Sequence, residues 1–508
     1  MTTRPEISIV VPVFNAGDRF RPCMESLVNQ TLDHSRYEIV LVDDGSSDGC
    51  EHICDEYAEK YPSFVRTFHQ PPSGYASYPR NRGIDEALGE FIFFQDADDI
   101  MLPEACERML THAREWGSDV LVVRQTFRWP DGREEVSPSY AARNNPCVPR
   151  GPRFAEAFTA DMHLRRLYRR DLILESGVRF KNTLSEDFLF NEEIMYYANT
   201  VSFANDYTYV WYMQWEVGNI SSSQFQPEVK TFDGRLRGIK WMLDFIDEKN
   251  LRGEAYPYLY KKILEHPVYR MLTTAMDQRS WDEELPRMGE LKDVLADHWD
   301  YCVAEKVKFT ERAVIEALMI GQYELMPAVR YLGRRSAKAQ TGFKLSTDWS
   351  LHSEGVSSVF GPLSGLSEFV RHGLITRQLN ALEVSKAVSS VEGAKVRFEV
   401  GLSFPQMAAM ITEANLVAID KAGSETVIPL ELISGCEQDV FELMEKGCTL
   451  PYAGEFSLGD QQAHEYKFEL VARIGQHTVR VKNPGLSIPK PAQKSTCSKL
   501  KKKLGFGK

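Results

Sequence analysis

The stretch Phe91-Ile92-Phe93-Phe94-Gln95-Asp96-Ala97-Asp98-Asp99-Ile100 decides the fold prediction. Its four consecutive apolar residues predict a strand buried on both faces, as in the centre of a helix-covered parallel sheet. The strand runs into three carboxylates, and ligands of open α/β sheets bind beyond the carboxyl ends of strands. Neighbouring carboxylates repel unless a cation joins them, and a hard divalent metal suits their oxygen atoms. The alternative is a solvated acidic turn before a helix that starts at Leu102-Pro103-Glu104.

Composition excludes several classes of protein. The chain has 508 residues, enough for about two to four domains, and its 60 Lys+Arg against 72 Asp+Glu give a net charge of −12. This balance argues against general nucleic-acid binding, so an anionic partner would need a local basic patch. The nine cysteines are scattered without paired C-x-x-C units, which favours reduced thiols and disfavours zinc. Without a signal peptide or a run of ~18 apolar residues, we expect a cytoplasmic protein, at most peripherally associated with the inner face of a membrane.

A parallel βαβ unit is predicted at the N-terminus. The apolar run Ile7–Phe14 predicts a strand, and a helix follows with Phe20, Met24, Leu27 and Val28 at helical spacing. A second buried strand, Tyr37–Val42, ends in Asp43-Asp44-Gly45-Ser46-Ser47-Asp48-Gly49. Such residues also form ordinary turns and helix caps, so their position at a strand's carboxyl end is the more informative feature.

A basic segment comes before the central strand. Val65–Phe68 predicts a short strand, and residues 70–83 predict a loop that enters a helix over Ile84–Leu88. Arg80 and Asn81 at the start of that helix could meet a diphosphate or a ribose, because charge and helix dipole both favour an anion there. The alternative is a surface cap.

These motifs resemble, in order and spacing, the family 2 glycosyltransferases, which have the GT-A (Rossmann-like) nucleotide-sugar fold. The matching segments are Ile-Val-Val-Pro-Val-Phe-Asn, Val-Asp-Asp-Gly-Ser-Ser-Asp, Asn-Arg-Gly-Ile-Asp-Glu-Ala-Leu-Gly-Glu-Phe-Ile and Asp-Ala-Asp-Asp, within residues 5–225. The resemblance implies that Pro12, Val13, Phe14 and Asn15 back the nucleotide and that Asp43 or Asp44 receives the uracil edge. It also implies that Asp96-Ala97-Asp98 is a DxD element whose two carboxylates hold the diphosphate through Mn²⁺ or Mg²⁺.

A later block extends the resemblance. Leu164–Phe180 leads to Glu186-Asp187 at the start of a predicted helix, where an acidic pair is often only a favourable N-terminal charge. In the family the Asp of this pair is the general base, which assigns that role to Asp187 and a supporting role to Glu186. An inverting transfer needs one such carboxylate and no covalent nucleophile. The family's late Arg is replaced by Gln214 or Trp215, so Arg80 or Arg82 is expected to support the diphosphate instead.

The C-terminal half changes character twice. After a catalytic domain at residues 1–225, amphipathic helices are predicted across 226–342, with Pro257 and Pro267 as interruptions. Alternation of apolar and polar residues then predicts a β-sandwich over 343–489, for association or acceptor binding. Residues 490–508 form a lysine-rich tail, read as disordered or as a weak electrostatic membrane contact.

This architecture and the tetrapeptide Tyr78-Pro79-Arg80-Asn81 also resemble the enzymes that attach N-acetylglucosamine to polyribitol-phosphate wall teichoic acid. That resemblance implies UDP-GlcNAc as donor, an anionic polymer as acceptor and trimers through the C-terminal region. The acceptor would use basic residues of the helical part: Lys261, Lys262, Arg270, Arg330, Arg334, Arg335 and Lys338. Three alternatives stay open: a polysaccharide glycosyltransferase with a neutral sugar acceptor, a nucleotidyltransferase, and a non-catalytic binding protein.

Overall fold

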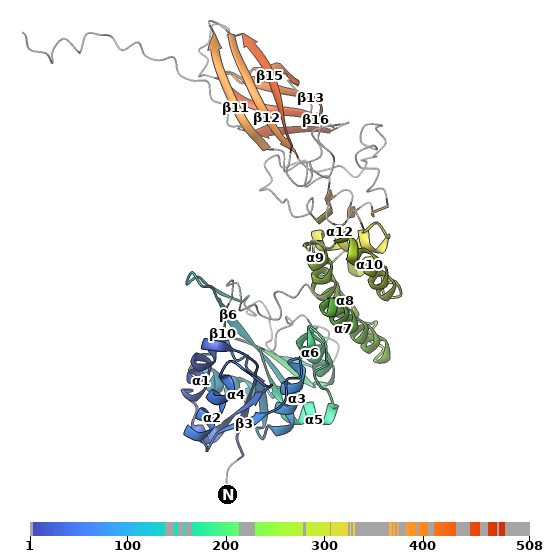
Figure 1. Cartoon of the computed structure of the whole chain (residues 1–508). Helices are drawn as coiled ribbons and strands as arrows, with labels where there is room; N and C mark the ends of the chain where they lie inside the picture. The colour runs from blue at the N-terminus through green and yellow to red at the C-terminus, as the bar shows by residue number, and fades with distance from the viewer. Residues whose placement is uncertain are drawn as a thin grey trace, which may run out of the picture. The chain divides into compact units, whose positions relative to one another are not determined.

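The structure is a computed structural model, and Figure 1 traces the whole chain. It describes residues 4–137, 147–150, 157–158, 165–212, 229–253, 255–277, 281–304, 306–323, 326, 329–330, 365–367, 369–370, 373–374, 383–392, 395–404, 411–432, 448–457, 466–474 and 477–482. The chain divides into two compact units, Met1–Val307 and Lys308–Lys508. The predictions for Gln214 and Trp215, for the basic residues 334–338 and for the tail 490–508 lie outside the described residues.

The first unit is built on a mixed sheet whose strand order is β3-β2-β1-β4-β9-β6-β10-β5, with β7 beside β6 and β8 beside β10. β1 pairs in parallel with both β2 and β4, whereas β9 runs antiparallel to β4. The predicted buried strand is confirmed, because all four residues of β4 are buried between β1 and β9. The strands are β1 (Ile7–Val13), β2 (Tyr37–Asp43), β3 (Val65–His69), β4 (Phe91–Phe94), β5 (Ile100–Met101), β6 (Val120–Arg128), β7 (Glu134–Val136), β8 (Cys147–Pro149), β9 (Arg166–Arg169) and β10 (Thr200–Tyr212).

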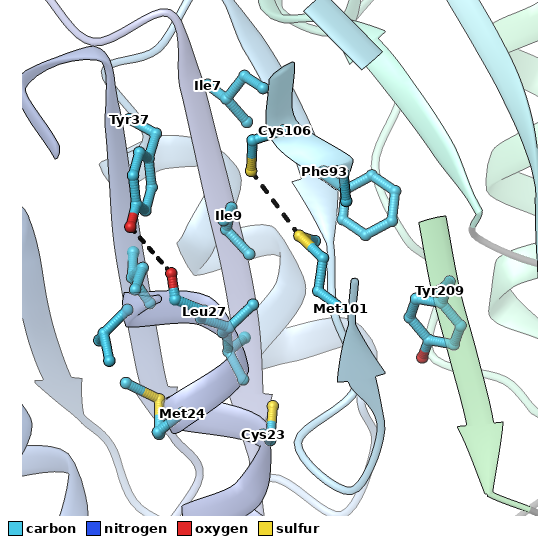
Figure 2. Packing of buried hydrophobic residues seen from close by; sticks show 14 of the residues in the cluster. Ile7, Ile9, Cys23, Met24, Leu27, Tyr37, Phe93, Met101, Cys106 and Tyr209 are labelled. Atoms are coloured by element: carbon cyan, nitrogen blue, oxygen red, sulfur yellow. Dashed lines mark hydrogen bonds between the residues drawn. The ribbon is translucent and has the colours of Figure 1, made fainter. Parts of the chain in front are cut away.

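Helices cover this sheet, and amphipathic helices such as α1 and α4 present an apolar stripe to it. In α1 the predicted residues Phe20, Met24, Leu27 and Val28 are all buried, as the 3.6-residue period requires. Figure 2 shows part of this layer, where the Tyr37 hydroxyl also donates to the Leu27 carbonyl oxygen at 3.0 Å. The helices are η1 (Gly17–Arg19), α1 (Phe20–Val28), η2 (His34–Arg36), α2 (Cys50–Lys60), α3 (Ser77–Glu86), α4 (Ala105–Glu115), α5 (Arg170–Ser176) and α6 (Glu186–Tyr197).

The predicted bounds of one helix were wrong. α3 spans Ser77–Glu86 instead of 84–88, so Arg80 and Asn81 lie inside it. Its Pro79 sits in the first turn, where a missing backbone N–H costs no hydrogen bond. Its Gly83 packs so closely on β1 that a Cβ there would lie 2.1 Å from Val10 Cγ1. Pro79 and Gly83, which favour a loop in the sequence, therefore belong to a tightly packed helix.

A group of helices belongs to the same compact unit. α7 carries the predicted stripe, and Pro257 opens α8 while Pro267 lies inside a π-helical turn. These helices pack against α6 through a buried ion pair between Lys262 Nζ and Glu192 Oε1 at 2.6 Å. They are α7 (Val229–Glu248), α8 (Tyr256–Ile263), η4 (Leu264–Val268), α9 (Tyr269–Asp277), α10 (Trp281–Ala296) and α11 (Tyr301–Ala304).

The second unit contains α12 (Phe309–Met319) and an antiparallel sheet of seven described strands in the order β11-β12-β15-β14-β13-β16-β17. The sheet curls on itself, since Phe398 of β12 and Phe468 of β16 meet with ring centroids 5.1 Å apart although three strands separate them in the order. The predicted sandwich is thus one curled sheet. Its strands are β11 (Glu383–Glu392), β12 (Lys395–Phe404), β13 (Ile411–Ile419), β14 (Glu425–Leu432), β15 (Cys448–Ser457), β16 (Lys467–Ile474) and β17 (His477–Lys482). Across the part of the chain that is described, no helix is both long and apolar enough to cross a membrane.

Candidate nucleotide-sugar site

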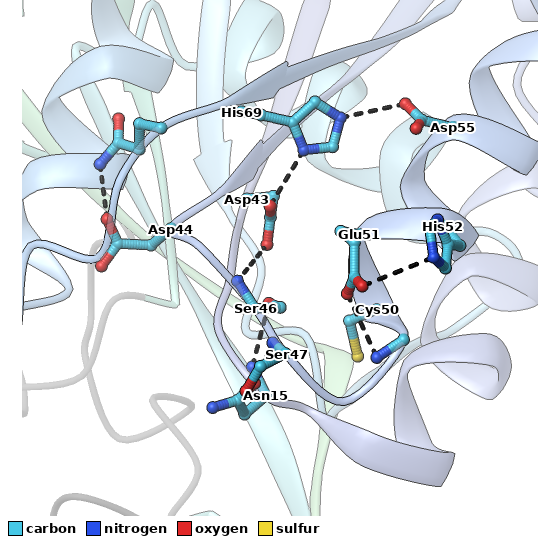
Figure 3. Close-up of polar contacts among 12 residues, drawn as sticks. Asn15, Asp43, Asp44, Ser46, Ser47, Cys50, Glu51, His52, Asp55 and His69 are labelled. Carbon is cyan, nitrogen blue, oxygen red and sulfur yellow. Dashed lines mark hydrogen bonds and ion pairs between the residues drawn. The ribbon is translucent and has the colours of Figure 1, made fainter.

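The ends of β1 and β2 are joined by side-chain hydrogen bonds (Figure 3). The strands are in parallel register up to Val13 and Asp43, and Asn15 then takes a left-handed conformation with φ 47°. The Asn15 N–H donates to Ser46 Oγ at 3.1 Å, and the Ser47 N–H donates to Asn15 Oδ1 at 2.8 Å. The two motif loops that the sequence placed at strand ends therefore form one surface.

Asp43 is buried under this surface and is fully bonded. Its Oδ1 accepts from the Ser46 N–H at 3.0 Å, and its Oδ2 lies 2.9 Å from His69 Nδ1. Burial alone would raise the pKa of Asp43, but the hydrogen bonds from Ser46 and His69 hold it below the ordinary value. His69 also contacts Asp55 at 3.0 Å through Nε2, and its hydrogen bonds to the carboxylates of Asp43 and Asp55 raise its pKa. Asp43 is thus held as a carboxylate.

Asp44 organises the loop that follows β3. Its carboxylate accepts from Gln70 Nε2 and from Ser73 Oγ, each at 2.7 Å, and from the Ser73 N–H at 3.2 Å. Gly45 beside it has φ 75°, and a Cβ there would lie 2.5 Å from Pro72 Cδ. The two adjacent aspartates are therefore both anchored, one by His69 and the other by the loop.

The acidic run after β4 holds three carboxylates in three environments. The Asp96 side chain is 47% exposed. Burial and the neighbouring Asp96 charge raise the pKa of Asp98 to about 6. Asp99 is buried and accepts from the Tyr209 hydroxyl at 2.5 Å and from the Tyr212 N–H at 2.9 Å. Asp99 therefore fastens the loop to β10, and the same short loop carries Asp96 and Asp98.

The donor set of Asp96 and Asp98 fits a divalent cation. Burial raises the pKa of Asp98, and the Asp96 charge raises it further, which is the response expected of carboxylates sharing a site. Among the described residues no group of three or more His, Cys, Asp or Glu side chains could hold a metal ion. The chain would therefore supply two oxygen ligands, and a bound diphosphate and water would supply the others.

Arg80 joins the acidic run to α6. Its side chain is only 8% exposed, with Nη2 2.9 Å from Asp96 Oδ1 and Nη1 paired with Glu186. Burial would lower the pKa of Arg80, but the charges of Asp96 and Glu186 raise it above its ordinary value. The structure places Arg80 between two carboxylates, and its contact with a diphosphate or a ribose stays a prediction.

Asp187 lies beside this bridge in the first turn of α6. The turn is set by Ser185, whose φ of 70° directs the chain into the helix, and the Phe188 N–H donates to Asp187 Oδ1 at 2.8 Å. Burial and the charge of Glu186 raise the pKa of Asp187 to about 7, and Arg80 opposes that rise. Asp187 can therefore gain and lose a proton near neutral pH, as a general base must.

Two other predicted residues have local partners. Asn81 exchanges two hydrogen bonds of 2.9 Å with the backbone of Phe180, which fixes α3 to the segment before α6. Arg82 donates to the His69 carbonyl oxygen at 2.6 Å. Phe14 is 55% exposed at the end of β1, whereas Val13 and Ala97 are buried.

The strand-end rule could have found one missed residue, because His69 ends β3 as Asp43 ends β2. Asp99 belongs to the predicted acidic run, but its partner Tyr209 is 110 positions away and left no local signal. Gln70 and Ser73 likewise carried no pattern of their own.

The fold and this acidic edge define a nucleotide-sugar-binding α/β domain of the GT-A type. Residues 8–173 match the family described as Glycosyl transferase family 2. The chain is 33% identical over 221 residues to the uncharacterized glycosyltransferase YibD of Escherichia coli K12, covering 42% of this chain and 63% of YibD. It is 31% identical over 225 residues to a poly(ribitol-phosphate) beta-glucosyltransferase of Bacillus spizizenii, covering 44% of this chain and 34% of that enzyme.

Solved structures of TarS from Staphylococcus aureus share the fold. The TarS structure aligns with a TM-score of 0.53 at 18% identity, covering 94% of this chain and 77% of TarS. The TarS 1–349 structure in complex with UDP-GlcNAc aligns with a TM-score of 0.51 at 21% identity, covering 64% of this chain and 90% of that fragment.

Proposed function

We propose that this chain is a metal-dependent inverting glycosyltransferase that moves a sugar, GlcNAc in our proposal, from a UDP-sugar to a hydroxyl of a cell-surface polymer. A polyol-phosphate teichoic acid is the proposed acceptor. The observation that carries this proposal is the arrangement Asp96–Arg80–Glu186 next to Asp187. It links the residues suited to a diphosphate and its cation to a carboxylate whose pKa is about 7.

In the proposed reaction Asp187 accepts the proton of the acceptor hydroxyl. The acceptor oxygen forms a bond to the anomeric carbon while the bond from that carbon to UDP breaks, so the configuration inverts. A divalent cation held by Asp96 and Asp98 would neutralise charge on the departing diphosphate. Arg80 keeps Glu186 and Asp96 in place. Its charge also lowers the pKa of Asp187, against the rise that burial and the Glu186 charge cause.

Two comparisons bear on the identity of the donor sugar, and they favour different sugars. The aligned TarS fragment was solved with UDP-GlcNAc. The relative from Bacillus spizizenii is named a glucosyltransferase, so UDP-glucose is the first competitor to test. The name of that relative also gives poly(ribitol-phosphate), which supports an acceptor of this class.

Basic residues of the helical part support an anionic acceptor. Arg235 on α7 is 7% exposed and bonds Thr274 Oγ1 at 3.3 Å. Burial and the nearby Arg270 charge lower the pKa of Arg235 to about 10, and Arg270 itself is exposed on α9. The Lys262 ammonium pairs with buried Glu192 and is not counted among the residues offered to the polymer. Association through the C-terminal sheet and membrane contact by the lysine-rich tail remain proposals.

Calorimetric titration of UDP, UDP-GlcNAc, UDP-glucose and CTP, with Mn²⁺, with Mg²⁺ and with EDTA, tests the donor and the cation. We expect UDP compounds to bind only with a cation, and Asp98→Asn to weaken that binding by about tenfold or more, on the scale of a lost charge-assisted contact. Asp18→Asn is the matched control, because Asp18 is an exposed aspartate of η1. Binding of CTP with pyrophosphate release in turnover would instead assign nucleotidyl transfer.

A further inference from the structure

Arg19 is a cation at the acidic edge, and it has no role in the proposed reaction. It closes η1, between the end of β1 and α1, and α1 lies against the acidic run through a contact of Cys23 Sγ with the Asp96 carbonyl oxygen at 3.6 Å. The Arg19 guanidinium carbon lies 5.3 Å from the centre of the Tyr212 ring. Tyr212 is the residue whose N–H bonds Asp99, so Arg19 lies beside the Asp96–Asp99 loop.

The guanidinium of Arg19 has an unused donor. Its Nη1 atom is buried and has no hydrogen-bond partner among the described residues. A buried donor without a partner loses the free energy of its hydration, so such a group requires an explanation, and a ligand that accepts the hydrogen bond is one. The other two arginines considered for this edge are engaged, Arg80 with two carboxylates and Arg82 with the His69 carbonyl.

The ring of Tyr212 limits how the guanidinium can move. Arg128 lies at the same distance from that ring, 5.3 Å, and donates to the Tyr212 hydroxyl at 2.7 Å. A guanidinium held over an aromatic face keeps its planar fork in one orientation, which suits bidentate binding of a phosphate group. The Arg19 charge acts on Asp98 and opposes the rise of the Asp98 pKa.

We propose that Arg19 binds the diphosphate of the donor, on the side of the cation site formed by Asp96 and Asp98. This assignment rests on the proposed function, because it names a further ligand of the same nucleotide. An arginine is needed there for a simple reason of charge. A diphosphate entering a loop with three carboxylates is repelled by them, and a single divalent cation does not neutralise both partners.

The test compares Arg19→Gln with Arg21→Gln. Arg21 has the same charge and is the second residue of α1, but it is exposed and paired with Glu56 at 2.7 Å. Calorimetry with UDP, UMP and uridine in excess Mg²⁺ separates the phosphates from the base. We expect Arg19→Gln to weaken UDP binding about tenfold or more, the scale for a hydrogen bond to a charged group, and to leave uridine binding unchanged. Arg21→Gln should match the wild type.

Arg19→Lys is the second variant, and it should bind UDP with an affinity between those of the wild type and Arg19→Gln, because it keeps the charge and loses the fork. If Arg19→Gln does not fold, a loss confined to UDP and UMP in Arg19→Lys supports the assignment and unchanged affinity contradicts it. Wild-type binding of UDP with equal binding by Arg19→Gln overturns the role of Arg19 and leaves the proposed function standing. Equal loss of uridine and UDP also overturns it. Absence of UDP binding by the wild type overturns both.

Discussion

The carboxyl edge of the N-terminal sheet and the surface of the C-terminal sheet both carry many charged side chains, but only the first buries them. Asp43, Asp44 and Asp99 are 3%, 4% and 2% exposed, and each has two or more hydrogen-bond partners. Among the residues of β11–β17 whose burial the structure describes, no charged residue is buried, and ion pairs such as Arg480–Glu425 are nearly half exposed on both sides.

The difference has an energetic basis. A buried charge costs free energy unless partners compensate it, whereas an exposed ion pair contributes little in either direction. The N-terminal sheet keeps several compensated charges along one edge, where the proposed function places the nucleotide, its cation and the acceptor hydroxyl. In the C-terminal sheet apolar side chains occupy the buried positions, for example Val396, Phe398 and Val400 on one face of β12.

The largest expected effect is at Asp187. Asp187→Asn should lower kcat by about 10²-fold or more, the scale for loss of a general base, and leave the affinity for UDP nearly unchanged. The matched control is Asp171→Asn, which removes the same charge from the exposed first turn of α5. Steady-state kinetics and calorimetry on the same preparations decide between the outcomes. Near-normal turnover would remove Asp187 from the role of base.

Arg80→Gln tests the bridge between the two carboxylate groups. Because the Arg80 charge lowers the pKa of Asp187, its removal should move the acidic limb of the pH–rate profile to higher pH, with a smaller loss of kcat than Asp187→Asn shows. The control is Arg82→Gln, two positions further along α3, where the arginine contacts a backbone carbonyl. An unmoved acidic limb in Arg80→Gln would mean that Arg80 does not act on the base.

A smaller effect is expected at His69 and concerns stability. Hydrogen bonds to Asp43 and Asp55 raise its pKa above the ordinary 6.5, so the stabilisation is fully present below pH 6.5 and is lost as the pH rises through the raised value. The difference in Tm between wild type and His69→Gln should therefore shrink from pH 6 toward alkaline pH. His52→Gln is the control, because its side chain is 84% exposed. A difference independent of pH would contradict the assignment of a charged His69.

The smallest effect is expected in the C-terminal sheet. Arg480→Ala removes an exposed cross-strand partner of Glu425 and should change the free energy of unfolding by about 0.5 kcal/mol or less, without altering donor affinity. Denaturant unfolding measures the first quantity and calorimetry the second. A loss of several kcal/mol would show that charges of the two sheets do not differ as described.

Much of the first unit could be predicted from sequence because its signals are local. The runs at Tyr37–Asp43 and Phe91–Phe94 are buried strands as expected, and the aspartates at their carboxyl ends lie on one edge of the sheet, since both strands are parallel to β1. The start of α3 was mispredicted because Pro79 and Gly83 favour loops locally while packing on β1 decides their conformation. Local patterns also gave no sign that Arg80 pairs with Glu186, 106 positions further on, since that contact depends on tertiary structure.

In the proposed reaction Asp187 is the base, and burial and the Glu186 charge raise its pKa. The most direct measurement is the pH dependence of kcat/KM for UDP release from UDP-GlcNAc with a ribitol-phosphate oligomer as acceptor, because kcat/KM reports the pKa values of the free enzyme. We expect kcat/KM to fall about tenfold per pH unit below a pKa of about 7 and to level off above it. A rate that stays constant down to about pH 5, where an ordinary carboxylate is still ionised, would contradict it.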